Sequence, residues 1–260
     1  MKRLLIVGAV LAGAEARADE PIQPGDLPVR TAERPLTVPK YMVSTSLAFA
    51  HVVVRQGTVT ARASAIAIGA NIGVTDDVEI EVVPLSLALT PTFALGNLRV
   101  GITKRLTRGA VEVGVRTQVT AVTGPTQGAK GVLATLGLPF LVRLGAYARF
   151  DTGLFLSGRY SSGENLASAG LPLALTVSPG DRVRLGLTSG VDLPSFGGNG
   201  PHVPLFLRAG VTLGQHALVD LDALFGYPVL AGPGGIHTNI WVVGGNITAF
   251  IPRATELRAQ

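Results

Sequence analysis

Hydrophobic and polar residues alternate with a period of two along most of this 260-residue chain. In Arg182–Leu193, one phase reads Val, Leu, Leu, Ser, Val, Leu, and the other reads Arg, Arg, Gly, Thr, Gly, Asp. The pattern recurs in Val111–Val122, Val203–Leu213 and Leu218–Phe225. A strand places each phase on one face, whereas a helix would spread the charged residues around its surface. The alternation therefore predicts β-strands.

The pattern predicts about twelve strands, each near the ~9–11 residues with which a strand crosses a membrane. Their approximate cores are residues 41–51, 61–74, 78–89, 96–105, 110–122, 132–144, 147–158, 170–178, 181–193, 203–213, 216–227 and 237–250. Tight turns are expected at Thr75–Asp77, Leu106–Gly109, Pro179–Asp181 and Gly214–Gln215, and longer loops at Val52–Thr60, Thr123–Gly131, Arg159–Gly170, Pro194–His202 and Pro228–Ile236. Short periplasmic turns that alternate with longer outer loops are typical of an outer-membrane barrel.

Composition separates a membrane barrel from soluble β-proteins. Mean hydropathy is +0.41 and only 15% of residues are charged, yet prolines interrupt the long apolar stretches. Because every backbone polar group needs a partner in lipid, a closed barrel is the alternative to spanning helices. A soluble lipocalin-like barrel or β-sandwich also alternates, but its polar phase faces water. Here that phase is rich in glycine, which favours an all-β, closed antiparallel transmembrane barrel.

The two ends of the chain differ from the repeating middle. Residues 1–18 combine a basic start, an apolar run and Ala16-Arg17-Ala18, the pattern of a secretory signal cleaved before Asp19. Residues 19–39 contain five prolines and are expected to form an extended periplasmic leader. The barrel is expected over residues 40–250, followed by a tail at 251–260. The chain has no cysteine, which excludes a lipid-anchored lipoprotein, disulfides and thiolate metal sites.

Charge narrows the range of partners. Loss of the signal would remove three basic residues and one acidic residue, which lowers the net charge from +5 to +3. The remaining charges are scattered, so no nucleic-acid-binding stripe is visible. The partners expected for such a barrel are outer-membrane lipids and lipopolysaccharide, the outer-membrane assembly machinery and a small polar solute.

Two short motifs and the hairpin pattern carry a resemblance. Arg34–Lys40 (RPLTVPK) directly precedes the first predicted strand, and Gly73–Ile80 (GVTDDVEI) forms a strand–turn–strand. With the alternating hairpins that follow, the chain resembles the small outer-membrane channel proteins of Gram-negative bacteria, including the phenol-degradation-associated channel family. The resemblance implies a passive channel or transporter-like role and no catalytic motif.

Candidate catalytic and metal-binding residues are few. A hydrolase would need a Ser–His pair with an orienting group, for which Ser195, Asp192, His202 and His237 are the candidates. No Gly-x-Ser-x-Gly sequence supports that reading. Two histidines without adjacent carboxylates make a poor metal site, and the glycine-rich stretches are read as loops. We therefore expect no enzyme, no metal and no cofactor.

The charged residues of the inward phase are the candidate pore-lining set. They are Glu79, Glu81, Arg99, Arg105, Glu112, Arg116, Arg143, Arg149, Asp151, Arg182, Arg184, Arg208, Asp220 and Asp222. Acidic residues fall on the third and fifth strands and an arginine-rich set on the sixth to ninth, most of them near the periplasmic end. Opposed charged walls would select solutes by charge and dipole. The alternative is a set of ion pairs that fills the lumen and stabilises the barrel.

These residues predict passive passage of small polar or anionic solutes. The competing hypothesis is a structural or surface-interaction barrel with a blocked lumen, and a membrane-embedded hydrolase is a distant third. The leader is expected either to fold back into the periplasmic mouth, with Asp19, Glu20, Asp26 and Glu33 available to pair with Arg149, Arg182 and Arg184, or to remain a disordered export spacer.

Overall fold

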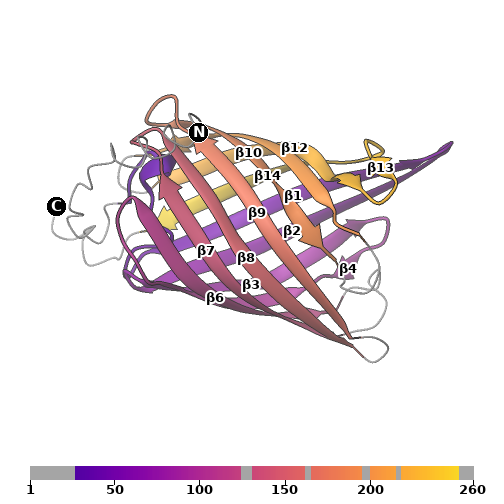
Figure 1. Ribbon diagram of the computed structural model, residues 1–260, viewed down its shortest axis with the longest axis horizontal. Helices are drawn as coiled ribbons and strands as arrows, with labels where there is room; N and C mark the ends of the chain where they lie inside the picture. Colours follow the sequence, from indigo (N-terminus) through magenta and orange to yellow (C-terminus); the bar gives the residue numbers. More distant parts are fainter. Residues whose placement is uncertain (1–26, 124–130, 162–164, 195–199, 215–217, 252–260) are drawn as a thin grey trace, which may run out of the picture.

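Twelve long antiparallel strands close into a barrel in the computed structural model, which describes residues 27–123, 131–161, 165–194, 200–214 and 218–251. Each long strand pairs with its neighbour in sequence, and β14 lies between β1 and β12, so the first and last strands close the sheet (Figure 1). The predicted fold class is confirmed.

All twelve predicted strands are present, with shifted ends. The long strands are β1 (Val43–Gln56), β2 (Val59–Thr75), β3 (Val78–Thr90), β5 (Leu98–Arg105), β6 (Val111–Val122), β7 (Gly131–Arg143), β8 (Ala148–Ser161), β9 (Leu166–Val177), β10 (Val183–Leu193), β11 (Val203–Leu213), β12 (Leu218–Gly232) and β14 (Ile240–Ile251). The two-residue strands β4 (Ala94–Leu95) and β13 (Gly235–Ile236) extend β3 and β12, respectively. A single 3-10 turn, η1 (Thr31–Glu33), is described before β1.

Three of the expected long loops are largely strand. In Arg159–Gly170, β8 runs to Ser161 and β9 begins at Leu166. Val52–Thr60 is mostly strand, because β1 and β2 remain paired as far as Gln56 and Val59 and leave only Gly57 and Thr58 as the turn. Gly57 has a φ of 60°, a conformation that glycine adopts without strain. The hairpin projects beyond the barrel, at the right of Figure 1. In the same way, β12 continues to Gly232 through the expected loop 228–236.

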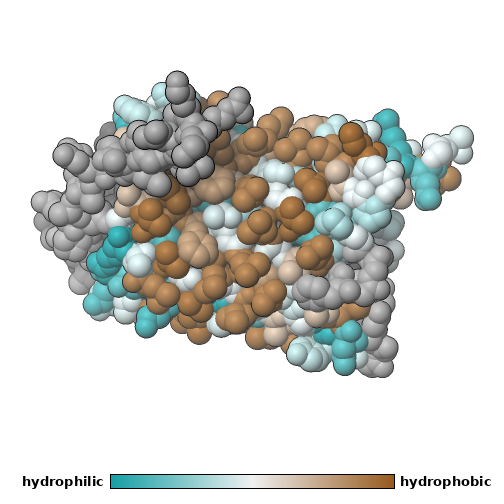
Figure 2. Space-filling model, viewed as in Figure 1, coloured by the Kyte–Doolittle hydropathy of each residue, from teal (hydrophilic) through white to brown (hydrophobic). Residues whose placement is uncertain are grey.

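The outward phase of the strands forms an apolar surface. Leucine, isoleucine and valine side chains such as Leu136, Leu156, Leu185 and Leu207 are about half exposed. Figure 2 shows a broad hydrophobic belt on the visible face, between more hydrophilic ends. No helix in the described part of the chain is long and apolar enough to cross a membrane. A contiguous apolar surface of this extent on a closed barrel fits contact with lipid.

Candidate pore and the leader inside its mouth

The segment Leu27–Met42, called the leader from here on, lies in the end of the barrel where β1 begins and β14 ends. Its Leu27, Val38 and Met42 pack with Leu218 of β12 in a small buried cluster. Phe250 of β14 packs against the same cluster. These contacts exclude the disordered spacer for residues 27–42, whereas residues 19–26 lie outside the described part of the chain.

Backbone hydrogen bonds join the leader to the second sequence motif. The N–H of Val38 donates to Glu79 Oε2 over 2.7 Å, and the N–H of Lys40 donates to Asp76 Oδ1 over 3.0 Å. The Thr37 hydroxyl donates to the Asp76 carbonyl over 2.8 Å. The motifs Arg34–Lys40 and Gly73–Ile80, which are separate in the sequence, therefore lie against each other inside the mouth.

Two inward-facing glycines make room for this segment. A β-carbon at position 73 would overlap the carbonyl oxygen of Pro39, and one at position 114 would lie 2.8 Å from Leu36 Cδ2. Real β-carbons essentially never approach this closely. The wall is thus shaped to the leader at Gly73 on β2 and at Gly114 on β6, which is evidence of a fitted contact.

Arg34 of the leader is the centre of its electrostatic attachment. Its guanidinium makes two bonds to the Asp220 carboxylate, of 2.5 and 3.1 Å, and both side chains are over nine-tenths buried. It also lies over the Phe250 ring, 4.8 Å from the centroid. A bidentate arginine–carboxylate pair fixes geometry as well as charge.

Among the acidic residues predicted to pair with the wall, only Glu33 is described, and for Glu33 the prediction was wrong. Glu33 pairs with Arg30 within the leader itself, while the basic residue Arg34 pairs with an acidic residue of the wall. Arg149 contacts the leader through the carbonyl oxygens of Thr31 and Arg34 rather than through a carboxylate. Asp19, Glu20 and Asp26 lie outside the described residues. The sequence alone did not reveal Arg34 because its partner is 186 positions away.

The acidic residues near the mouth are paired with arginines on neighbouring strands. Glu112, with a side chain only 1% exposed, binds Arg105 at 3.4 Å and Arg143 at 2.6 Å, and accepts the N–H of Leu36 at 2.7 Å. Deeper along the wall, Glu81 pairs with both Arg99 and Arg116. Arg149 pairs with Asp151 two residues along β8.

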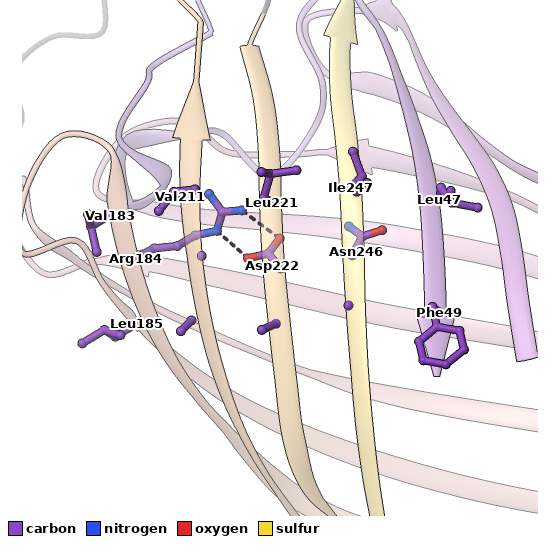
Figure 3. Close-up of a pocket in the computed structure, with 14 residues that line it drawn as sticks. Leu47, Phe49, Val183, Arg184, Leu185, Val211, Leu221, Asp222, Asn246 and Ile247 are labelled. Atoms are coloured by element: carbon purple, nitrogen blue, oxygen red, sulfur yellow. Dashed lines mark hydrogen bonds and ion pairs between the residues drawn. The ribbon is translucent and has the colours of Figure 1, made fainter. Parts of the chain in front are cut away.

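A second network spans β10, β11 and β12. Arg184 of β10 crosses β11 to reach Asp222 of β12, at 2.7 Å, and lies 3.3 Å from Asp220 (Figure 3). It passes over Gly210, where a β-carbon would overlap Asp222 Oδ1 and lie 2.8 Å from Arg184 Nε. Arg208 of β11 binds the same Asp222 carboxylate at 2.6 Å.

The opposed acidic and basic walls that the sequence predicted are therefore absent from the described residues. Glu79 accepts a hydrogen bond from the leader. Two or more arginines contact each of the other four carboxylates, those of Glu81, Glu112, Asp220 and Asp222. Arg182 stands apart, because it precedes β10 and is exposed. Assigning acidic and basic residues to separate strands did not predict these ion pairs, because a long arginine side chain reaches a carboxylate one or two strands away.

A turn outside the barrel strands carries a third charged group. Asp77 lies between β2 and β3 and binds Arg108 at 2.7 Å and Arg105 at 3.0 Å. The hydrogen bond from Arg108 lowers the pKa of the Asp77 carboxyl, and Arg105 adds to this effect against partial burial. Together with Asp76, the turn holds both the leader and the loop before β6.

Inside the lumen, beyond the leader, lies a cavity of about 410 Å³. One side is formed by small residues of β1, β2 and β3, among them Ala48, Ala67 and Ser86. The other side carries the Arg208–Asp222 ion pair and Asn246, together with Phe206 and Leu224. The space falls within the range of small-molecule sites and combines apolar walls with few polar groups.

The hydrolase candidates form no described catalytic group. Asp192 and His202 are joined by backbone hydrogen bonds of 2.8 and 2.7 Å, and the His237 ring lies 3.3 Å from the Pro233 carbonyl. Ser195 lies outside the described residues. No cluster of three or more metal-ligating side chains is found in the part of the chain that the structure describes. The absence of enzyme activity stays a prediction.

Comparison with known proteins finds a similar fold among solved structures. No protein-family model matches the chain, and no curated protein matches it. An outer-membrane channel from Pseudomonas putida F1 matches with a TM-score of 0.57 and 12% identity, over 83% of this chain and 97% of that one.

Two further solved structures are less similar to this chain. The translocator domain of the autotransporter NalP from Neisseria meningitidis has a TM-score of 0.47 and 12% identity, over 97% of this chain and 95% of that one. The CymD monoaromatic hydrocarbon channel has a TM-score of 0.47 and 8% identity, over 82% of this chain and 89% of that one. This chain therefore shares the closed β-barrel fold of the outer-membrane channel from Pseudomonas putida F1.

Proposed function

We propose that the protein is an outer-membrane channel for small polar or anionic solutes and that the leader gates its periplasmic mouth. The observation that carries the proposal is a closed barrel with an internal cavity at the level of Arg208 and a fitted leader at one end. The apolar outer belt supports residence in a bilayer, where outer-membrane lipids and lipopolysaccharide would surround it. In this proposal the chain reaches the outer membrane by secretory export and barrel assembly.

The leader suits a gate because its attachment is reversible. It is held by hydrogen bonds, a small apolar cluster and one buried ion pair, each of which exchanges with water when the segment leaves. Asp220 would keep Arg184 and Thr212 as partners after departure of Arg34. Departure of Arg34 therefore does not leave Asp220 as a buried unpaired charge.

A disulfide lock tests the gate directly, because the chain contains no cysteine. Leu36→Cys with Gly114→Cys joins positions that are in contact across the mouth. The shorter cysteine at position 36 removes the contact with Leu36 Cδ2, and the Lys104 carbonyl oxygen, at 3.0 Å, is then the nearest neighbour of the new β-carbon. In planar bilayers, the oxidised double variant should show few or no conductance steps. Reduction should restore steps at the frequency of the Leu36→Cys single variant, which is the matched control.

Equal conductance before and after reduction would remove the gating role. If neither the wild type nor a variant that lacks residues 20–36 conducts after correct folding, the blocked-lumen barrel replaces the channel. That alternative has one observation in its favour, the leader packed inside the mouth. Its function would then lie at the opposite end, where the β1–β2 hairpin projects.

A further inference from the structure

We propose that the cavity beyond the leader is a binding site for a monocarboxylate with a compact apolar body, recognised by Arg208. The inference rests on the proposed channel function and names the class of solute that its lumen holds. It is carried by the charge balance around Arg208 and by the apolar residues in register with it.

The charge balance leaves one positive charge at the cavity. Arg34, Arg184 and Arg208 share two carboxylates, those of Asp220 and Asp222. Arg34 and Arg184 are almost fully buried, whereas the Arg208 side chain is 48% exposed and lines the cavity. The excess positive charge is therefore presented to the lumen by Arg208, whose planar guanidinium can bind a carboxylate.

On the side of Arg208 that faces β12, β14 and β1, the strand register continues through apolar or small residues. Arg208 pairs in turn across the sheet with Leu224, Gly244, Ala50, Ala65 and Ala88. Directly paired residues share one face of a sheet, so this half-ring faces the lumen together with Arg208. Because its methyl groups offer nothing to a hydrated ion, the wall favours a ligand that is apolar away from its charge.

The two features together restrict the ligand. A single negative charge neutralises the excess, whereas a dianion would leave a net negative charge against an apolar wall. Asn246 and Thr188 supply neutral polar groups in the same cavity. A neutral hydrocarbon would leave the excess positive charge at Arg208 unneutralised, because Arg208 shares the Asp222 carboxylate with Arg184. Acetate would leave the apolar wall uncovered.

Ligand-observed saturation-transfer NMR on the full protein, extracted from membranes into a nonionic detergent, tests the site. Cyclohexanecarboxylate is the probe, and cyclohexylmethanol and acetate lack the charge and the apolar body, respectively. We expect saturable binding of the probe and at least tenfold weaker binding of either control. Arg208→Gln should weaken probe binding at least tenfold, as should Ala50→Phe, which fills the cavity and keeps the charge.

Arg62→Gln is the matched control, since Arg62 lies on the exposed outer part of β2 and should bind the probe normally. Equal binding of cyclohexylmethanol and cyclohexanecarboxylate, or unchanged binding in folded Arg208→Gln, overturns the proposal. The readout is independent of conductance. Binding without conductance leaves the site and removes the channel, whereas conductance without binding removes the site alone.

Discussion

At the scale of single residues, a glycine in the lumen wall lets an arginine side chain cross the strand that carries it. An arginine can then reach a carboxylate two strands away, because the strand between them has no β-carbon at that position. Gly210 is the clearest example, because Arg184 passes over it to Asp222. The glycines that the sequence showed in the polar phase thus have individual functions as crossing points and docking surfaces.

Gly210→Ala should disrupt the Arg184–Asp222 pair, because the added β-carbon overlaps the carboxylate oxygen. We expect a loss of about 1–3 kcal/mol in the free energy of unfolding, the range for a buried polar group left without good partners. Urea unfolding of the detergent-folded protein measures it. Gly186→Ala is the control, since its β-carbon would meet only ordinary contacts at 3.4 Å. A loss as large in Gly186→Ala would contradict this account.

Asp77 contributes to the free energy of unfolding in a pH-dependent way, and the lowered pKa fixes the sign of that dependence. Arg108 and Arg105 lower its pKa in the folded state, so its stabilisation is fully present above the unfolded-state value of about 3.9. It is lost as the pH falls through the lower folded-state pKa. Asp77→Asn should therefore be less stable than wild type at pH 7, by under about 1 kcal/mol for a partly exposed pair. The difference should shrink at pH 3, and a constant difference between urea-unfolding curves would refute the linkage.

At the scale of elements, the leader is the part whose behaviour most affects function. It has one turn of 3-10 helix and otherwise bends, turns and irregular chain, so it depends on the barrel for its order. Its attachment combines the Arg34–Asp220 pair with backbone donors to Glu79, Glu112 and Asp76. An element held in this way can detach as a unit while the barrel stays folded.

Arg34→Ala should loosen the leader selectively. Loss of its charge-assisted bonds removes about 1.5–3 kcal/mol of docking free energy, or roughly a ten- to hundredfold increase in the undocked fraction. Hydrogen exchange of the Leu36 and Val38 amides should accelerate accordingly, with β7 and β8 unchanged. Arg30→Ala is the control, because Arg30 pairs with the exposed Asp181 at the rim. Equal acceleration in both variants would show that Arg34 has no special role.

At the scale of the whole molecule, closure removes every sheet edge among the long strands. β1 pairs with β2 on one side and with β14 on the other, and β11 pairs with β12, so each strand has two neighbours. Such closure satisfies the backbone inside lipid and leaves the outward phase free to be apolar. The hairpin β1–β2 is the main departure from a simple cylinder.

The barrel predicts an exported, membrane-embedded product. After expression in a Gram-negative host, the protein should fractionate with outer membranes and begin at Asp19. Folded protein should migrate faster than heated protein on a denaturing gel, since heat opens a closed barrel. Protein sequencing and gel migration measure the two properties. Recovery in the soluble periplasmic fraction would reject the membrane assignment, and an intact Met1 in the membrane fraction would reject cleavage alone.

The sequence by itself determined the fold class, the number of long strands and most of their positions, because a period of two is a local property of the backbone. It also identified the charged residues of the inward phase and the two motifs that meet in the mouth. Only the tertiary structure decided which of these residues contact one another. Arg34 with Asp220, Glu79 with the Val38 amide, and Arg208 with a wall of alanines are contacts between distant segments. Barrel closure and strand register create them, and neither is encoded in any one stretch of residues.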